Sequence, residues 1–151
     1  YDALTAYGVN MFMYAWGTAV GFDYIVPSQD GADKVELTME QVYEFDPDIV
    51  IFAAYKNSLA EAYATPQWMA LRAGAEGKLY TAPICLDVWA MANTQCVLLY
   101  EWALVEFYPE YAEGIDLKKD TYEFYKTFYG YELTDNEVEA VLEGNRLYLQ
   151  Q

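Results

Sequence analysis

The sequence predicts an α/β domain in which helices cover both faces of a mainly parallel sheet, a three-layer αβα arrangement. Apolar runs of strand length, at 49–54 and 78–83, alternate with segments of helical periodicity. The first run is apolar throughout, which is typical of a strand buried on both faces of a parallel sheet. A chain of 151 residues can bury a real core, so we predict one domain over residues 1–151.

The first third of the chain predicts helix, loop and helix. Apolar residues from about Asn10 indicate a helix that ends at Gly21, and the Pro- and Gly-containing stretch 23–32 predicts a loop. Thr38 and Gln41 match a capping box, which starts a helix of about two turns. That helix ends near Phe45, because the Asp-Pro pair at 46–47 disfavours helix.

The middle of the chain predicts a strand, a helix and a second strand. After the strand at 49–54, Thr65 at the N-cap and Pro66 at the first helical position start a helix. Gly74 is expected to end this helix, before the strand at 78–83.

The last third predicts three helices. Residues 94–108 are apolar nearly all round, which indicates a central buried helix. Residues 118–129 are amphipathic and are followed by Gly130 as a C-cap. Thr134 and Glu137 form a second capping box, before a helix whose predicted buried face is Val138, Val141 and Leu142.

The composition excludes several functions. A formal charge of −16 disfavours binding to nucleic acid and to anionic membrane surfaces. The chain has no His, so Ser-His-Asp and Cys-His catalysis are impossible within it. We predict no cofactor and no metal site, since Cys85 and Cys96 do not fit zinc spacing. These two cysteines form either a disulfide or buried thiols.

No segment reads as a transmembrane helix or a signal peptide. The most apolar run, 96–108, is short and contains Glu101 and Glu106. The chain opens at Tyr1 rather than Met, which we interpret as a start produced by processing or fragmentation.

Five motifs in order resemble a known family. They are ELTMEQV at 36–42, DPDIVI at 46–51, GKLY at 77–80, YPE at 108–110 and FYKTFYG at 124–130. Their order and spacing are similar to the C-terminal lobe of class III periplasmic substrate-binding proteins of ABC importers for iron-siderophore, haem or cobalamin. The segment YELTDNE at 131–137 resembles the closing helix of iron-type members.

The resemblance implies a binding role without catalysis, outside the cytoplasm. Family members have two lobes joined by a long helix, and the metal-chelate ligand lies between them. The resemblance therefore implies that the N-terminal lobe, the linking helix and the first strand of the C-terminal lobe are absent from this chain. We expect the surface they would cover to be exposed or used in self-association.

The ligand wall is expected beyond the carboxyl ends of the parallel strands. This rule selects three loops, and seven polar or aromatic side chains in them are assigned to the ligand: Tyr7, Asn10, Tyr55, Lys56, Asn57, Asp87 and Trp89. Tyr55 and Trp89 would stack on a flat chelate, and Lys56 would meet an anionic group. The alternatives are that Trp89 packs between loop and sheet and that Lys56 is a solvated charge.

The segment 58–64, after the first predicted strand, holds a candidate for the transporter contact. Members of the family dock on the permease through an acidic residue of each lobe, and Glu61 is our candidate in this lobe.

Two other functional classes compete with this interpretation. An acid–base enzyme would need a carboxylate pair such as Asp46 and Asp48, or Glu110 and Glu113. The first pair lies at the wrong end of a strand, and the second is typical of a solvated helix exit. A non-catalytic cell-surface domain for carbohydrate or an oxyanion would use the abundant Tyr and Trp, although carbohydrate-binding domains are usually rich in β-structure.

Overall fold

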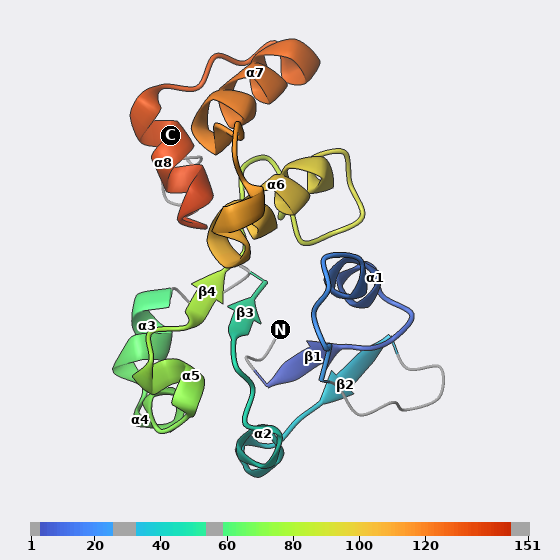
Figure 1. The fold of residues 1–151 in the computed structure, drawn as a ribbon, viewed down its shortest axis with the longest axis vertical. Helices are drawn as coiled ribbons and strands as arrows, with labels where there is room; N and C mark the ends of the chain where they lie inside the picture. The colour runs from blue at the N-terminus through green and yellow to red at the C-terminus, as the bar shows by residue number, and fades with distance from the viewer. Residues whose placement is uncertain (1–3, 26–32, 54–58, 146–151) are drawn as a thin grey trace. The chain divides into compact units, whose positions relative to one another are not determined.

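A computed structural model describes residues 4–25, 33–53 and 59–145 of the chain (Figure 1). The chain divides into two units, Tyr1–Thr81 and Ala82–Gln151, each with its own internal contacts. The single domain predicted over 1–151 stays a prediction. No helix within the described ranges is long and apolar enough to cross a membrane.

The first unit alternates strands and helices, as the α/β prediction requires. Its described elements are β1 (Thr5–Tyr7), α1 (Phe12–Ala19), β2 (Lys34–Glu36), α2 (Met39–Phe45), β3 (Val50–Phe52), α3 (Leu59–Ala64), α4 (Pro66–Met69), α5 (Arg72–Ala75) and β4 (Leu79–Thr81). Strands β3 and β4 pair in parallel, with Ile51 opposite Tyr80. The intervening chain, with α3, α4 and α5, supplies the long crossover that a parallel pair needs.

The N-terminal strand pair differs from the prediction. Strand β1 pairs with β2 in antiparallel fashion, with Ala6 opposite Val35. One of the two described pairings is thus antiparallel, so "mainly parallel" holds only for β3 and β4. The sequence did not predict β1, because the short Thr-Ala-Tyr segment pairs with a partner far along the chain. Such pairing gives no local sequence signal.

A cluster of apolar side chains forms the core of the first unit. Its buried members are Val42, Ala62, Trp68, Leu71, Ala73 and Leu79. Phe52 of β3 meets the Trp68 ring edge-to-face, with 5.1 Å between ring centroids, a favoured aromatic geometry. The cluster therefore packs the helices between β3 and β4 onto that strand pair.

The predicted helix from Thr65 to Gly74 is broken into α4 and α5. Thr65 occupies the N-cap position, but its hydroxyl donates to the Glu61 carbonyl at 2.8 Å instead of accepting from its own helix. Gly74 lies inside α5 and does not end the helix. Glycine is required there for another reason: a Cβ at Gly74 would lie 2.0 Å from the carbonyl oxygen of Trp68.

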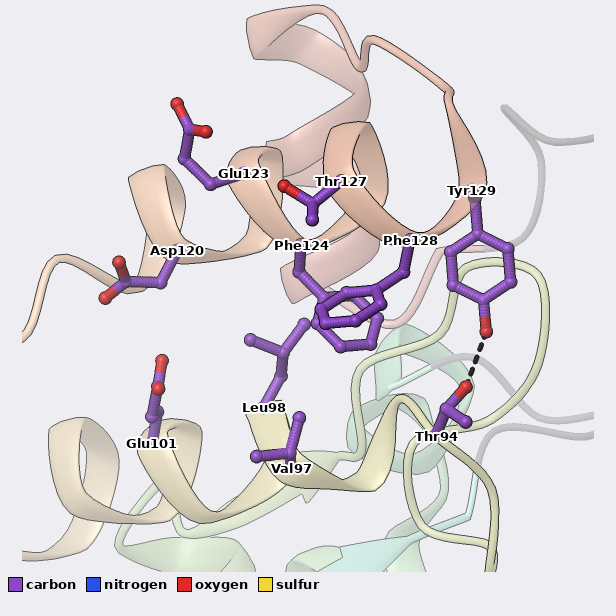
Figure 2. A pocket seen from close by; sticks show the side chains of 10 residues that line it. All are labelled: Thr94, Val97, Leu98, Glu101, Asp120, Glu123, Phe124, Thr127, Phe128 and Tyr129. Atoms are coloured by element: carbon purple, nitrogen blue, oxygen red, sulfur yellow. Dashed lines mark hydrogen bonds between the residues drawn. The ribbon is translucent and has the colours of Figure 1, made fainter.

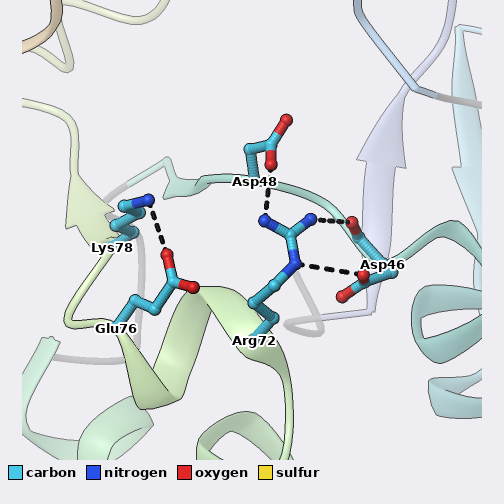
Figure 3. Close-up of polar contacts among 5 residues, drawn as sticks. All are labelled: Asp46, Asp48, Arg72, Glu76 and Lys78. Carbon is cyan, nitrogen blue, oxygen red and sulfur yellow. Dashed lines mark hydrogen bonds and ion pairs between the residues drawn. The ribbon is translucent and has the colours of Figure 1, made fainter.

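Arg72 joins α5 to the turn that follows α2 (Figure 3). Its guanidinium donates to Asp48 at 2.6 Å, to the Asp46 carboxylate at 3.1 Å and to the Asp46 carbonyl at 3.0 Å. Asp46 adopts a left-handed φ of 40° as the C-cap of α2. The hydrogen bond from Arg72, with its charge, lowers the pKa of Asp48. The carboxylates of Asp46 and Asp48 thus form ion pairs with Arg72. This structural role accounts for the two acidic residues without a catalytic function.

The second unit is helical. After the loop that follows β4 come α6 (Cys96–Phe107), the 3₁₀ turn η1 (Pro109–Tyr111), α7 (Leu117–Tyr129) and α8 (Asp135–Leu142). Both predicted capping boxes form, at Thr38 and at Thr134, and Gly130 ends α7 in a left-handed conformation. On α8, Val138 and Val141 are buried as predicted, whereas Leu142 is half-buried.

A buried polar chain organises this unit. The Trp89 indole N–H donates to the Tyr125 hydroxyl at 3.0 Å, and that hydroxyl donates to the side-chain oxygen of Gln95. The same Gln95 oxygen accepts the backbone N–H of Asp87 at 3.4 Å. Burial, helped by the adjacent Cys85 thiol, raises the pKa of Tyr125, so its hydroxyl remains a donor. The loop after β4, the start of α6 and helix α7 are therefore joined by hydrogen-bonded side chains. Replacing any one of these side chains leaves a buried partner without its hydrogen bond.

Replacing Gly74 with Ala should destabilise the protein by roughly 3 kcal/mol, because its Cβ would overlap backbone that cannot swing aside. At an ordinary helix site the same change stabilises by about 1 kcal/mol, so the sign tests the contact. Urea unfolding measures the effect. Gly77→Ala is the control: Gly77 has φ +73° and no atom within 4 Å of an added Cβ, and should lose only about 1 kcal/mol. A smaller loss at Gly74 than at Gly77 would contradict the explanation.

Tyr125→Phe should lower the free energy of unfolding by about 1–3 kcal/mol, because the Trp89 N–H and the Gln95 oxygen lose a buried partner. Urea unfolding again provides the measurement. Tyr111→Phe removes a hydroxyl from a ring that is 72% exposed, and should change stability little. Equal effects of the two variants would show that the buried chain does not stabilise the unit.

The second capping box makes stability depend on pH. The Thr134 backbone N–H, with the Tyr131 and Thr134 hydroxyls, lowers the pKa of Glu137. The ionised carboxylate thus stabilises the folded state above the unfolded pKa of about 4.3, and this contribution is lost as pH falls through the lowered folded pKa. Glu137→Gln should reduce the urea midpoint at neutral pH, and its difference from wild type should shrink on acidification. A difference that stays constant down to strongly acid pH would refute this assignment.

Candidate functional site

The first group of predicted site residues lies at the end of β1. Tyr7 is the last residue of the strand and is half-buried, and its carbonyl accepts the Tyr24 hydroxyl at 3.3 Å. Burial, with the neighbouring Tyr7, raises the pKa of Tyr24 to about 12. Asn10 is exposed in the turn that leads to α1. Tyr7 therefore ends β1 and Asn10 follows it, and β1 is antiparallel to its partner β2.

The second group follows β3. Tyr55, Lys56 and Asn57 lie outside the described residues, so their assignment to the ligand stays a prediction. Glu61 is exposed in the first turn of α3. An exposed carboxylate fits a docking contact, and its role toward a permease stays a prediction as well.

The third group is the loop after β4, where the structure separates two residues that were predicted to act together. Asp87 is exposed, and its carboxylate accepts the backbone N–H of Val88 at 2.7 Å. Trp89 is fully buried. Its ring is packed in the core and its N–H is bound by Tyr125, so the packing alternative describes Trp89 and a stacking role does not. A buried Trp needs a partner for its N–H, and Tyr125 was the partner that sequence reasoning did not identify.

Carboxylates and thiols in the described ranges do not assemble a metal centre. Cys85 and Cys96 are both free, the first buried and the second half-buried. Burial raises the pKa of the Cys85 thiol, which keeps it protonated and unreactive. Of the two alternatives for these cysteines, the structure has the thiols. Glu110 and Glu113 are exposed near η1, as expected for a solvated helix exit.

Sequence reasoning missed an open groove between α6 and α7 (Figure 2). The groove has a volume of about 770 Å³ and is lined by Thr94, Val97, Leu98, Glu101, Asp120, Glu123, Phe124, Thr127, Phe128 and Tyr129. Helix α6 was predicted to be a central buried helix, yet its Val97 is 51% exposed. Phe128 of the amphipathic helix α7 is 71% exposed. The sequence did hold a signal for the groove: the two helices carry more apolar residues than their mutual contact buries.

The groove has an acidic end and an aromatic middle. Figure 2 shows Glu101 of α6 and Asp120 of α7 at one end, and Phe124 and Phe128 beyond them along α7. The two phenyl rings lie 4.9 Å apart between centroids. At the far end the Thr94 and Tyr129 hydroxyls are hydrogen-bonded at 2.7 Å.

Glu101 in this groove has a carboxylate oxygen whose hydrogen-bonding capacity is unused among the described residues. Its Oε2 is buried and lacks a hydrogen-bond partner within the part of the chain that the structure describes. Burial, with the charge of Asp120, raises the pKa of Glu101. A buried carboxylate oxygen beside a second carboxylate is costly unless a cation or donor meets it.

Sequence comparisons leave the chain without a match: no protein-family model and no curated protein aligns with it. Comparison of structures gives matches over nearly the whole chain. A periplasmic solute-binding protein from Veillonella parvula superposes with a TM-score of 0.81 and 26% identity, over 91% of this chain and 43% of that protein.

Two further structures share the fold at lower identity. The molybdate-bound periplasmic binding protein MolA of a Haemophilus influenzae ABC transporter matches with a TM-score of 0.75 and 19% identity, over 89% of this chain and 41% of that one. Helicobacter pylori Ceue with Ni(II) bound matches with a TM-score of 0.68 and 17% identity, over 91% and 44%. The chain thus spans less than half the length of each.

Coverage of nearly all of this chain by less than half of each matched protein agrees with the resemblance given by the motifs. The chain has the α/β fold of a single lobe of the class III type of periplasmic solute-binding protein of ABC transporters.

Proposed function

We propose that this chain is one lobe of the substrate-binding component of an ABC importer, acting outside the cytoplasm. The observation that carries the proposal is the match to the Veillonella parvula solute-binding protein, which extends over 91% of the chain. The matched proteins are binding proteins and not enzymes, and the ion pair of Asp46 and Asp48 with Arg72 agrees with this.

In this proposal the ligand is held against a second lobe of the same protein. The share of the matched proteins that this chain spans, 43% in the Veillonella case, supports a half-site. On this lobe the contributing side chains would be Tyr7, Asn10 and Asp87, with Tyr55, Lys56 and Asn57 after β3. Trp89 is left out of this set, because its side chain is fully buried and its N–H donates to Tyr125. Glu61 would contact the permease.

Two ligand classes are in competition. The first is a metal chelate such as a ferric siderophore, haem or cobalamin, which the sequence motifs favour. The second is an oxyanion, which is favoured by the molybdate bound to one matched protein. The two classes differ in size and in charge, so a direct titration separates them.

We expect the longer protein that includes an upstream lobe to be stabilised by one ligand class, because binding to the folded state raises the unfolding temperature. Thermal shift and absorbance would be recorded with haemin, a ferric catecholate, a ferric hydroxamate, cobalamin, molybdate and Ni(II). The chain of 151 residues alone should respond weakly or not at all. An equal response of the chain alone would contradict the half-site, and no response of either protein to any ligand would contradict the proposed ligand classes.

A substitution locates the site on this lobe. Asp87→Asn in the longer protein should reduce the ligand-induced shift, because it changes the charge of an exposed side chain at the proposed wall. Glu110→Gln, on the exposed η1 turn, is the matched control and should leave the shift unchanged. Equal behaviour of the two variants would remove Asp87 from the site.

A further inference from the structure

The α6–α7 groove is lined by several exposed apolar side chains. Val97, Phe128 and Tyr129 are among the large hydrophobic side chains left exposed in the chain, and all three line this one groove. Exposed apolar patches rimmed by polar residues mark sites of protein interaction.

The shape of the groove fits a helix. Helices α6 and α7 run in opposite directions along its two sides (Figure 2). From Asp120 to Tyr129 the floor follows α7 for about 13 Å, which is the length of two to three helical turns. An amphipathic helix binds such a groove through apolar side chains at i, i+3 or i+4, and i+7.

The charge of the groove selects the chemistry of that helix. Glu101, Asp120 and Glu123 lie toward one end, and Oε2 of Glu101 is buried without a partner among the described residues. A metal ion is not the natural partner, since no described Asp, Glu and Cys side chains are grouped as a metal site. A Lys or Arg side chain would meet both the charge and the unused hydrogen-bonding capacity.

A second copy of this chain is a poor occupant. The chain carries 24 acidic and 8 basic residues, so two copies repel each other, and the acidic end of the groove would face further negative charge. The same charge disfavours an anionic membrane surface.

We propose that the α6–α7 groove is a docking site for a basic amphipathic helix of another protein. The apolar face of that helix lies on Phe124, Phe128 and Val97, and a Lys or Arg at one end reaches Glu101 and Asp120. This inference stands apart from the proposed transport role, because it concerns a surface built wholly within the second unit.

The test uses a synthetic helical peptide as the probe. The peptide has about fourteen residues, or roughly four turns, with Leu and Phe at i, i+3, i+4 and i+7 and with Lys and Arg at one end. A fluorescent label reports binding to the 151-residue chain by anisotropy. A shuffled peptide of the same composition, which has the same charge and no apolar stripe, is the control. We expect the patterned peptide to bind at least tenfold more tightly than the shuffled one.

Variants then locate the site. Phe128→Ala should weaken binding about tenfold, since an exposed aromatic anchor is lost. Tyr111→Ala, whose ring is equally exposed at 72% but lies outside the groove, should not. Glu101→Gln should weaken binding about fivefold and reduce its salt dependence, whereas Glu110→Gln outside the groove should do neither.

Three outcomes would overturn the proposal. The first is equal affinity for the patterned and shuffled peptides, which would indicate unspecific attraction to an acidic surface. The second is an equal effect of the groove variants and their controls. The third is loss of binding in the longer protein, which would mean that the remainder of the protein itself covers the groove.

Discussion

Burial of a single indole N–H constrains most of the second unit. The N–H of a buried Trp usually has a hydrogen-bond acceptor, and the Trp89 N–H donates to the Tyr125 hydroxyl. The Tyr125 hydroxyl in turn donates a hydrogen bond to the side-chain oxygen of Gln95, at the start of α6. The loop after β4 and the adjoining start of α6 are thereby tied to Tyr125 of α7, which lies 36 residues after Trp89 and 30 residues after Gln95 in the sequence. The bond from Tyr125 of α7 to Gln95, the N-cap of α6, links the two helices that border the groove.

The first unit relies on backbone contact where the second relies on side chains. Gly74 brings α5 against the Trp68 carbonyl, which places Trp68 for its contact with Phe52 of β3. Arg72, two residues earlier, binds both carboxylates of the Asp-Pro-Asp turn. The turn and α5 lie at the same end of the β3–β4 pair, since the Val50 backbone N–H donates to the carbonyl of Lys78, just after α5, at 3.1 Å. The Asp-Pro-Asp motif, which contributed to the resemblance to binding proteins, thus has a structural role. Both of its carboxylates form ion pairs with Arg72.

The polar and apolar surfaces of the second unit also serve different ends. Helices α6 and α7 bury Leu98, Leu99, Trp102 and Tyr125. Their groove side retains the exposed Val97 and Phe128, and an oxygen of Glu101 that has no hydrogen-bond partner among the residues the structure describes. A side chain kept at a cost to stability is better explained by a contact with another molecule than by folding. This distinguishes the groove from the loop at Asp87, where the Asp87 N–H donates to Gln95 at the start of α6 and the Asp87 carboxylate accepts the Val88 N–H.

Local signals in the sequence determined the elements with local causes. Both capping boxes, the left-handed Gly130 and the β3 and β4 strands are set by residues within a few positions of one another, and they were predicted correctly. The lobe-like α/β fold followed from the order of these elements. Tertiary structure alone decided what depends on distant partners: the pairing of β1 with β2, the position of Gly74 inside a helix, and the burial of Trp89. It also decided that Phe128 remains exposed, because a helical pattern identifies an apolar face but not whether a neighbour covers it. Periodicity reports the direction of a side chain, and only packing between distant segments determines what that side chain meets.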